Sequence, residues 1–323
     1  MVLGKAGEIR GNPRSVRVAA PGKINVSLRV GPLREDGYHG IASVFLAVSL
    51  YEEVTATPMP GQEVTVSVTG AGPFPIPTDA VPLDSTNLAV RAARLLAEVS
   101  PASTGVHLDI VKKVPVSGGM GGGSADAAAA LLACEALWGS GFSRDELAKI
   151  AGELGADVPF ALLGGTAVGL GVGEQLTPAI SKTPLHFVLV PADYGLSTPV
   201  VYRLLDGIRE RKGFEPPAQP EVNSSILGAM RSGDGHGLAP LLQNDLQEAA
   251  LELAPGLGDI LGRGQKAGAL AGIVSGSGPT VAFLASSEGH AAELESRLTA
   301  EGLIAMAVHG PVHGARIHTG HPA

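Results

Sequence analysis

Apolar and polar residues alternate along the first part of the chain, which is the pattern of half-buried β-strands. From Ser15 to Val30 this pattern predicts two short strands on either side of Pro21 and Gly22. In the second strand the apolar residues share one face, so Lys23 and Asn25 lie together on the polar face. Further strands are predicted at residues 44–54, 64–68 and 106–110, with a turn at residues 55–61.

Helix signals follow in the same half of the chain. Residues 87–99 have helical character, and residues 143–155 have the clearest helix boundaries. Ser143 and Glu146 form a capping box at the start of this second helix, and Gly155 suits its end. Asp157 then lies in a turn, and Pro159 is typical of the start of another short helix.

The pattern breaks around residues 178–185, and a new apolar strand, HFVLVPA, begins at residue 186. We therefore predict two domains of mixed strand and helix, residues 1–180 and 181–323, with residues 1–14 disordered. Helices are predicted in the second domain at residues 199–209, 238–253 and 288–300, and strands at residues 270–274, 281–284 and 304–308. The composition of residues 209–222 predicts a loop.

Composition limits the function classes. Of the 323 residues, 45% are hydrophobic and only 4% are aromatic, and the net charge of −8 without a basic stripe argues against a general nucleic-acid binder. No apolar run reaches the ~18 residues of a membrane span, and the N-terminal residues lack a signal-peptide core. We expect a cytoplasmic monomer or weak homodimer with no membrane partner, in which the single Cys134 is a buried small hydrophobe.

The segment VPVSGGMGGGSADAAAALLA, residues 114–133, places five glycines in six positions and continues into an alanine-rich helix. A helix N-terminus offers unpaired N–H groups and partial positive charge, and glycines let a phosphate approach the backbone. The alternative is a tight turn with positive φ angles, for which one or two glycines normally suffice. P-loop and dinucleotide-binding patterns are absent, as are the HRD and DFG motifs of protein kinases. We interpret the segment as a phosphate-binding loop of another kind.

Three motifs carry a family resemblance. PVSGGMGGGSADAA resembles the ATP loop of the GHMP small-molecule kinases, and APGKINVSL and IVSGSGPTVAFL resemble the first and third motifs of that superfamily, in the same order. The resemblance implies an α+β fold with an N-terminal domain like the second domain of ribosomal protein S5 and a C-terminal ferredoxin-like domain. It also implies an active site in the cleft between these domains and direct phosphoryl transfer from ATP with Mg²⁺.

The resemblance implies that Asp157 accepts the proton of the substrate hydroxyl and that Lys23 orients both groups. Without it, the alternative for Asp157 is a helix N-cap, a role compatible with the first, and the alternative for Lys23 is a solvated lysine at a strand end. Ser124 either caps the helix or contacts phosphate and magnesium, and no other metal ligand is identified. The residues expected to contact ATP are Pro115, Ser117, Gly118, Gly119, Met120, Gly121, Gly122, Gly123 and Ser124.

Other polar residues near the loop receive structural interpretations. We interpret Asp126 as a complement to the helix dipole. Lys112 and Lys113 either meet ATP or form a solvated strand end, and we favour the second. The turn SGSGP, residues 275–279, either lines the cleft or is an ordinary tight turn. The histidines at positions 186, 309, 313 and 318 have no spacing typical of a metal site.

REDGYH, residues 34–39, resembles the segment with which one branch of the family recognises a cytidine diphosphate substrate. The resemblance implies that Tyr38 stacks on cytosine, that His39 hydrogen-bonds it and that Tyr202 is the second stacking ring. Asn25 either binds this small-molecule substrate or caps a turn. The alternatives are an exposed turn at Tyr38, a homoserine- or mevalonate-type GHMP kinase, and a catalytically silent nucleotide sensor.

Overall fold

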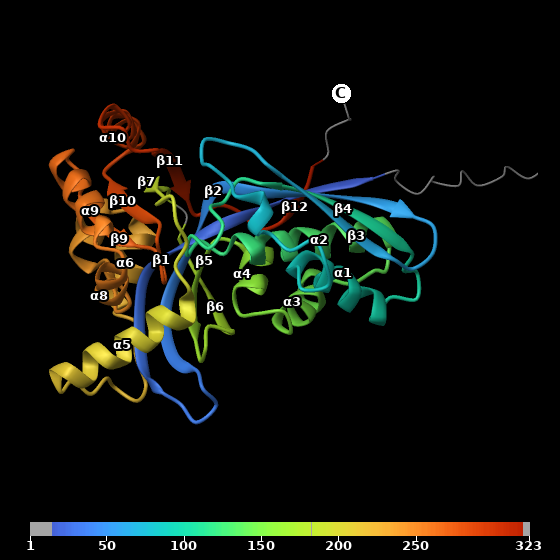
Figure 1. Ribbon diagram of the computed structural model, residues 1–323, viewed down its shortest axis with the longest axis horizontal. Coiled ribbons are helices and arrows are strands. Elements are labelled where there is room, and N and C mark those ends of the chain that lie inside the picture. The colour runs from blue at the N-terminus through green and yellow to red at the C-terminus, as the bar shows by residue number, and fades with distance from the viewer. Residues whose placement is uncertain (1–14, 182, 319–323) are drawn as a thin grey trace, which may run out of the picture.

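The computed structural model describes residues 15–181 and 183–318, which form two β-sheets with helices packed against them (Figure 1). The predicted disorder of residues 1–14 falls outside the described residues. In the first sheet the order is β12-β1-β2-β4-β3, with β5 pairing β2 and β6, and β8 pairing β1. Its strands are β1 (Val16–Leu33), β2 (His39–Met59), β3 (Val64–Gly70), β4 (Gly105–Lys112), β5 (Thr166–Leu170), β6 (Gln175–Ala179), β8 (Gln243–Asn244) and β12 (Arg316–Ile317).

The second sheet is antiparallel, in the order β11-β7-β10-β9. Its strands are β7 (Leu185–Val190), β9 (Ala271–Val274), β10 (Val281–Ala285) and β11 (Met306–Gly310). β6, in the first sheet, ends at Ala179, and β7, in the second sheet, begins at Leu185. The chain therefore passes from one sheet to the other where we predicted a domain boundary. The boundary itself stays a prediction, since β8 and β12 return from the second half of the chain to β1.

Helices near the first sheet are α1 (Leu88–Val99), α2 (Gly122–Trp138), α3 (Arg144–Gly152) and α4 (Asp157–Leu163). The second half contributes α5 (Thr198–Lys212), α6 (Ser224–Ser232), α7 (Gly235–Leu238), α8 (Gln247–Leu253), α9 (Gly256–Lys266) and α10 (Glu288–Ala300). Figure 1 shows α1 to α4 grouped along one part of the long strands β1 and β2, and α8 to α10 grouped at the other. The fold is therefore the expected α+β arrangement.

Helix α2 is the centre of the first half. It is buried on all sides, from Ala125 through Cys134 to Trp138, in one cluster with side chains of α1, α3, α4 and the first sheet. A helix that is apolar all round is stable only as the core of a packed structure. Its first turn is consequently held in place by its surroundings, which matters because this turn borders the site described below. Cys134 is buried, as predicted.

Several predicted elements are confirmed and others are wrong. The helix at residues 87–99 is α1, and the capping box of Ser143 and Glu146 opens α3. The two strands predicted around Pro21 are one strand, β1, with an irregularity in its pairing between Pro21 and Lys23. Proline is tolerated there because it lies at this irregularity, where the regular pairing of β1 with β2 is interrupted.

Other segments also differ from the predictions. β2 continues to Met59 through the predicted turn, because β4 pairs with it as far as that residue. The helix predicted at residues 238–253 is broken into a short 3-10 turn, β8 and α8, and Pro240 lies at the break. The hairpin of β5 and β6 and the helices α6 and α9 were not predicted.

Candidate active site

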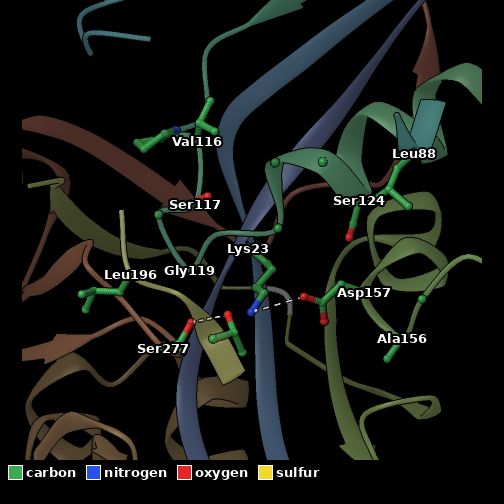
Figure 2. Close-up of a pocket in the computed structure, with 18 of the residues that line it drawn as sticks. Lys23, Leu88, Val116, Ser117, Gly119, Ser124, Ala156, Asp157, Leu196 and Ser277 are labelled. Atoms are coloured by element: carbon green, nitrogen blue, oxygen red, sulfur yellow. Dashed lines mark hydrogen bonds and ion pairs between the residues drawn. The ribbon is translucent and has the colours of Figure 1, made fainter. Parts of the chain in front are cut away.

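A cavity of about 720 Å³ lies between the first sheet and the second half of the chain. Its wall contains residues from β1, the glycine-rich loop before α2, the start of α4 and the segment leading into α5. Figure 2 shows Lys23 and Asp157 pointing toward each other, with Ser124 near Asp157 and Ser277 across the cavity. The cleft expected from the family resemblance is therefore present.

The glycine-rich loop has a backbone conformation that demands glycine at two positions. Gly119 has φ +74°, and a Cβ atom there would lie 2.1 Å from the carbonyl oxygen of Ser275. Gly121, with φ +69°, is the N-cap of α2. Ser124 lies inside the first turn of α2, so the interpretation of its hydroxyl as the helix cap is wrong, and it lines the cavity instead.

The turn SGSGP packs directly on this loop. The Ser275 hydroxyl donates to the carbonyl oxygen of Gly119 at 3.1 Å, and the N–H of Thr280 donates to that of Gly118 at 3.3 Å. The side-chain amide of Asn244 donates to the carbonyl oxygen of Gly276 at 2.7 Å. The second half of the chain thus braces the glycine-rich loop from outside, and its turn also contributes to the cavity wall.

Lys23 is held in place rather than solvated. It lies within β1 and is 8% exposed, and its ammonium donates to Asn25 Oδ1 at 2.7 Å. Asn25 in turn donates to the hydroxyl of Ser43 at 2.8 Å, and the Lys23 N–H donates to the carbonyl oxygen of Met120 at 2.9 Å. The interpretation as a solvated strand-end lysine is therefore wrong. Lys23 connects β1 both to the glycine-rich loop and to Asn25.

Asp157 faces this ammonium. Its Oδ2 lies 3.6 Å from Lys23 Nζ, and about a third of its side chain is exposed. Asp157 is the first residue of α4, whose N-cap is Ala156, so the alternative reading of Asp157 as an N-cap is wrong. An accessible carboxylate beside a buried ammonium can accept a proton from a hydroxyl group placed in the cavity.

A buried cluster of charges underlies the loop. Lys112, at the end of β4, donates to Glu52 and, at 2.7 Å, to Asp126 Oδ2. All three side chains are nearly inaccessible to solvent, and a Cβ atom on Gly122 would lie 2.9 Å from Glu52 Oε1. The favoured interpretation of Lys112 as a solvated strand end is therefore wrong, whereas a contact with ATP stays a prediction, since Lys112 is among the residues that line the cavity. Asp126 pairs with Lys112 rather than complementing the dipole of α2.

Burial and mutual repulsion of the carboxyl groups perturb this cluster. Burial, reinforced by the charge of Asp126, raises the pKa of Glu52 to about 8, although Lys112 opposes the shift. Burial also raises the pKa of Asp126. Burial alone would lower the pKa of Lys112, but Asp126 and Glu52 outweigh it and raise that pKa. Asp126 Oδ1 is buried without a hydrogen-bond partner. Lys113 instead pairs with Glu53.

The residues expected to bind the substrate base are only partly brought together. His39 is buried, its ring centroid lies 5.0 Å from that of Tyr202, and Tyr202 lines the cavity. Burial, with a smaller effect of the charge of Asp157, raises the pKa of Tyr202 to about 12. Tyr38 is 65% exposed, and neither Tyr38 nor His39 is among the residues that line the cavity. A stacking role for Tyr38 stays a prediction.

The glycine-rich loop faces open space at Gly121. A Cβ atom on Gly121 would lie 3.5 Å from Lys23 Cε and 3.7 Å from Asp157 Oδ2, so glycine keeps the space between loop and side chains open.

Residues 15–181 and 183–318 contain no group of three or more histidine, cysteine or acidic side chains able to hold a metal ion. Within the same ranges no helix is long and apolar enough to cross a membrane.

The sequence of the chain is similar to that of known kinases. The family profile of the GHMP kinases N terminal domain matches residues 87–165, and that of the GHMP kinases C terminal domain matches residues 226–303. The chain is 62% identical over 304 residues to 4-diphosphocytidyl-2-C-methyl-D-erythritol kinase of Arthrobacter sp. (strain FB24), covering 94% of this chain and 95% of that relative. The chain belongs to the 4-diphosphocytidyl-2-C-methyl-D-erythritol kinase family of GHMP kinases.

Solved structures agree with this assignment. A crystal structure of 4-(cytidine 5'-diphospho)-2C-methyl-D-erythritol kinase superposes with a TM-score of 0.72 at 33% identity, covering 91% of this chain and 98% of that one. A homoserine kinase from Cytophaga hutchinsonii ATCC 33406 superposes with a TM-score of 0.71 at 18% identity, covering 98% and 100%, which shows the fold alone. As a GHMP kinase the protein uses ATP, and the glycine-rich loop lies within the residues that match the N-terminal family profile.

Sequence reasoning missed three polar residues that support the site. Glu52 was read only as part of a strand, and Asn244 as part of a helix. Asp206, on α5, accepts a hydrogen bond from His39 Nε2, with its two oxygens 2.9 and 3.1 Å away. A signal for Asp206 was present, because it follows Tyr202 by four residues and so lies on the same face of a helix.

Proposed function

We propose that the protein transfers the γ-phosphoryl group of ATP to the 2-hydroxyl group of 4-(cytidine 5'-diphospho)-2-C-methyl-D-erythritol, a step of the non-mevalonate isoprenoid precursor pathway. The observation that carries the proposal is the pairing of Lys23 with Asp157 at 3.6 Å, opposite the glycine-rich loop in one cavity. The 62% identity to a relative named for this substrate supports the choice of alcohol.

In the proposed reaction Asp157 accepts the proton of the 2-hydroxyl group as its oxygen bonds to the γ-phosphorus. The bond from phosphorus to the bridging oxygen of ADP breaks in the same direct transfer, so no phosphoenzyme forms. Lys23, fixed by Asn25, orients the carboxylate and supplies positive charge where negative charge develops. Asn25 is thereby assigned to positioning as well as to substrate contact.

The loop from Pro115 to Ser124 is the proposed phosphate site. Residues 121–124 line the cavity at the start of α2, where the backbone N–H groups carry partial positive charge. Mg²⁺ bound to the nucleotide neutralises phosphate charge, and the Ser124 hydroxyl is the side chain of this chain proposed to contact it. The base is proposed to lie by Tyr202 and His39, with Tyr38 closing over it from the exposed turn.

We place the protein in the cytoplasm, where ATP is available and a free thiol such as that of Cys134 stays reduced. The net charge of −8 supports a small-molecule substrate rather than nucleic acid as the binding partner. A monomer or weak homodimer is the oligomeric state we propose.

The test is ADP release by the purified protein with Mg-ATP and one alcohol at a time: the cytidine diphosphate methylerythritol substrate, mevalonate or homoserine. Activity with the first alone is expected. Activity with mevalonate or homoserine instead would replace the substrate assignment. ATP binding without turnover of any alcohol would favour the sensor alternative.

A substitution tests the role of Asp157. Asp157→Asn is expected to lower kcat by roughly 100- to 10,000-fold, the usual loss when a proton acceptor is removed, with ATP affinity nearly unchanged. Asp259→Asn, on the exposed side of α9, is the matched control and should retain activity. A parallel loss of ATP binding in Asp157→Asn would instead show that Asp157 maintains the structure of the cavity.

A further inference from the structure

One face of α5 is attached to the hairpin of β1 and β2. Tyr202, Asp206 and Arg209 follow one another at spacings of four and three residues, which places them on one side of the helix. Arg209 donates to the carbonyl oxygens of Val30 at 2.7 Å and Gly31 at 3.0 Å, near the end of β1. Figure 1 shows α5 crossing these two strands. The attachment fixes where the other two side chains of this face lie.

The middle residue of this face, Asp206, accepts a hydrogen bond from the imidazole ring of His39. Its Oδ1 and Oδ2 lie 2.9 and 3.1 Å from Nε2. The ring of His39 also packs against Tyr202, and its side chain is only 6% exposed. Because the ring is enclosed on these sides, it cannot rotate freely to exchange its two nitrogens.

This contact determines which nitrogen of neutral His39 carries the proton. An ionised carboxylate only accepts hydrogen bonds, so Nε2 must donate and therefore bears the hydrogen. In neutral imidazole Nδ1 is then an acceptor. Among the hydrogen bonds of residues 15–181 and 183–318, those of the His39 ring involve Nε2 alone, so Nδ1 has no hydrogen-bond partner in this part of the chain.

We propose that Asp206 is a positioning residue which keeps the proton on Nε2 of His39 and so makes the site select cytosine over uracil. This rests on the proposed function, in which His39 reads the substrate base. At the position where cytosine carries an amino group, which donates, uracil carries a carbonyl oxygen, which accepts. An acceptor at Nδ1 of His39 forms a hydrogen bond with the amino group of cytosine. With uracil, two acceptors, Nδ1 and the carbonyl oxygen, face each other and repel.

Asparagine at position 206 removes this constraint. Its side chain offers an oxygen that accepts from Nε2–H and an amino group that donates to bare Nε2, so both tautomers of His39 become possible. With the proton on Nδ1, His39 donates to a carbonyl oxygen and accommodates uracil. Glutamate keeps an acceptor-only group and is expected to preserve the selection.

The first experiment compares kcat/KM for the cytidine and uridine diphosphate forms of the methylerythritol substrate. Wild type is expected to prefer the cytidine form by about 100-fold or more, and Asp206→Asn to reduce this ratio at least tenfold, mainly through KM. Asp206→Glu should restore most of the ratio. Asp245→Asn is the matched control, because Asp245 contacts Arg209 and the N–H of Val30 and should affect both substrates in parallel.

The outcomes separate the two proposals. If wild type phosphorylates neither substrate, the proposed function fails. If wild type phosphorylates the cytidine form and Asp206→Asn leaves the ratio unchanged, the function stands and the role of Asp206 is overturned. A ratio that falls equally in Asp245→Asn would also overturn it, because general loosening of α5 would then be the cause.

A second measurement does not depend on activity. Nitrogen-15 NMR of histidine-labelled protein distinguishes a ring nitrogen that bears hydrogen from one that does not. His39, assigned by its loss in His39→Gln, is expected to carry hydrogen on Nε2 in wild type and in Asp206→Glu at pH values where it is neutral. A mixture of tautomers is expected in Asp206→Asn. Hydrogen on Nδ1 in wild type would refute the proposal.

Discussion

The buried cluster of Glu52, Lys112 and Asp126 makes Asp126→Asn a stringent test of the electrostatics under the glycine-rich loop. One ammonium faces two carboxyl groups, so the cluster carries a net negative charge when all three groups are ionised. The substitution removes one of these charges and nearly preserves shape. It should therefore stabilise the protein at high pH, unlike most changes to a buried ion pair.

The magnitude follows from the geometry. Two carboxyl oxygens that bond the same Lys112 ammonium lie within about 5 Å of each other, and at an effective dielectric constant of about 20 their repulsion is about 3 kcal/mol. The shift in the pKa of Glu52 from 4.5 to about 8 corresponds to about 5 kcal/mol, of which burial is the larger part. We expect Asp126→Asn to recover about 1–3 kcal/mol above pH 8.

The sign of the pH dependence is fixed by these directions. The pKa values of Glu52 and Asp126 are raised in the folded protein. The stability that these two carboxyl groups contribute is fully present below about pH 4, near their pKa values in the unfolded chain. It is lost as the pH rises toward and through 8. The free energy of unfolding of Asp126→Asn minus that of wild type should therefore increase steadily between about pH 5 and pH 9.

The assay is urea unfolding followed by fluorescence of the single tryptophan, Trp138, which lies at the end of the same helix as Asp126. Unfolding curves at intervals from pH 5 to pH 9 give the difference directly, and Asp259→Asn is the exposed control. A pH-independent loss of about 3–5 kcal/mol would refute the reasoning, because Lys112 would then require both ionised carboxylates.

Two further predictions concern the loop and the core of α2. Gly119→Ala should destabilise the protein by more than about 2 kcal/mol and raise KM for ATP, because the new Cβ atom would clash with the Ser275 carbonyl oxygen. Gly139→Ala is the control, since Gly139 has φ +64° but nothing within 4 Å of a Cβ atom. This control measures the conformational cost alone, about 1 kcal/mol. Equal effects would show that the close approach is unimportant. Burial raises the pKa of the Cys134 thiol, so an aromatic disulfide reagent should label native protein at least about 1,000-fold more slowly than unfolded protein. Rapid labelling would contradict the packing of α2.

Local signals predicted the parts of the structure that are determined locally. The capping box at Ser143 and the alternation that brings Lys23 and Asn25 to one face depend on residues at most three apart, and both are confirmed. The glycine-rich loop was recognised because its backbone requirement is visible as composition. The backbone of Ser275, which leaves no room for a Cβ atom on Gly119, lies more than 150 residues away. The residues next to Gly119 in the sequence do not indicate this contact.

Charged residues show the same limit. Lys112 was interpreted as solvated because a lysine at a strand end usually is, and nothing near it in sequence indicates two buried acids. Glu52 is 60 residues away and Asp126 is 14, and they meet only because β2, β4 and α2 converge. The two-residue strands β8 and β12 are invisible to periodicity for a related reason, since their only signal is the strand they pair with.

The fold alone does not choose the substrate, because a homoserine kinase at 18% identity shares it with a TM-score of 0.71. The side of the cavity at which we propose phosphate binding is formed by backbone at the start of α2, where recognition would depend on N–H groups that any such loop supplies. The opposite side is formed by side chains of α5 and the β1–β2 hairpin, which Arg209 holds together. Selection among alcohols must therefore arise where these side chains differ. A donor or acceptor fixed by a carboxylate can discriminate between bases far more strongly than apolar contacts can, and we propose this role for the buried His39 with the partly exposed Asp206.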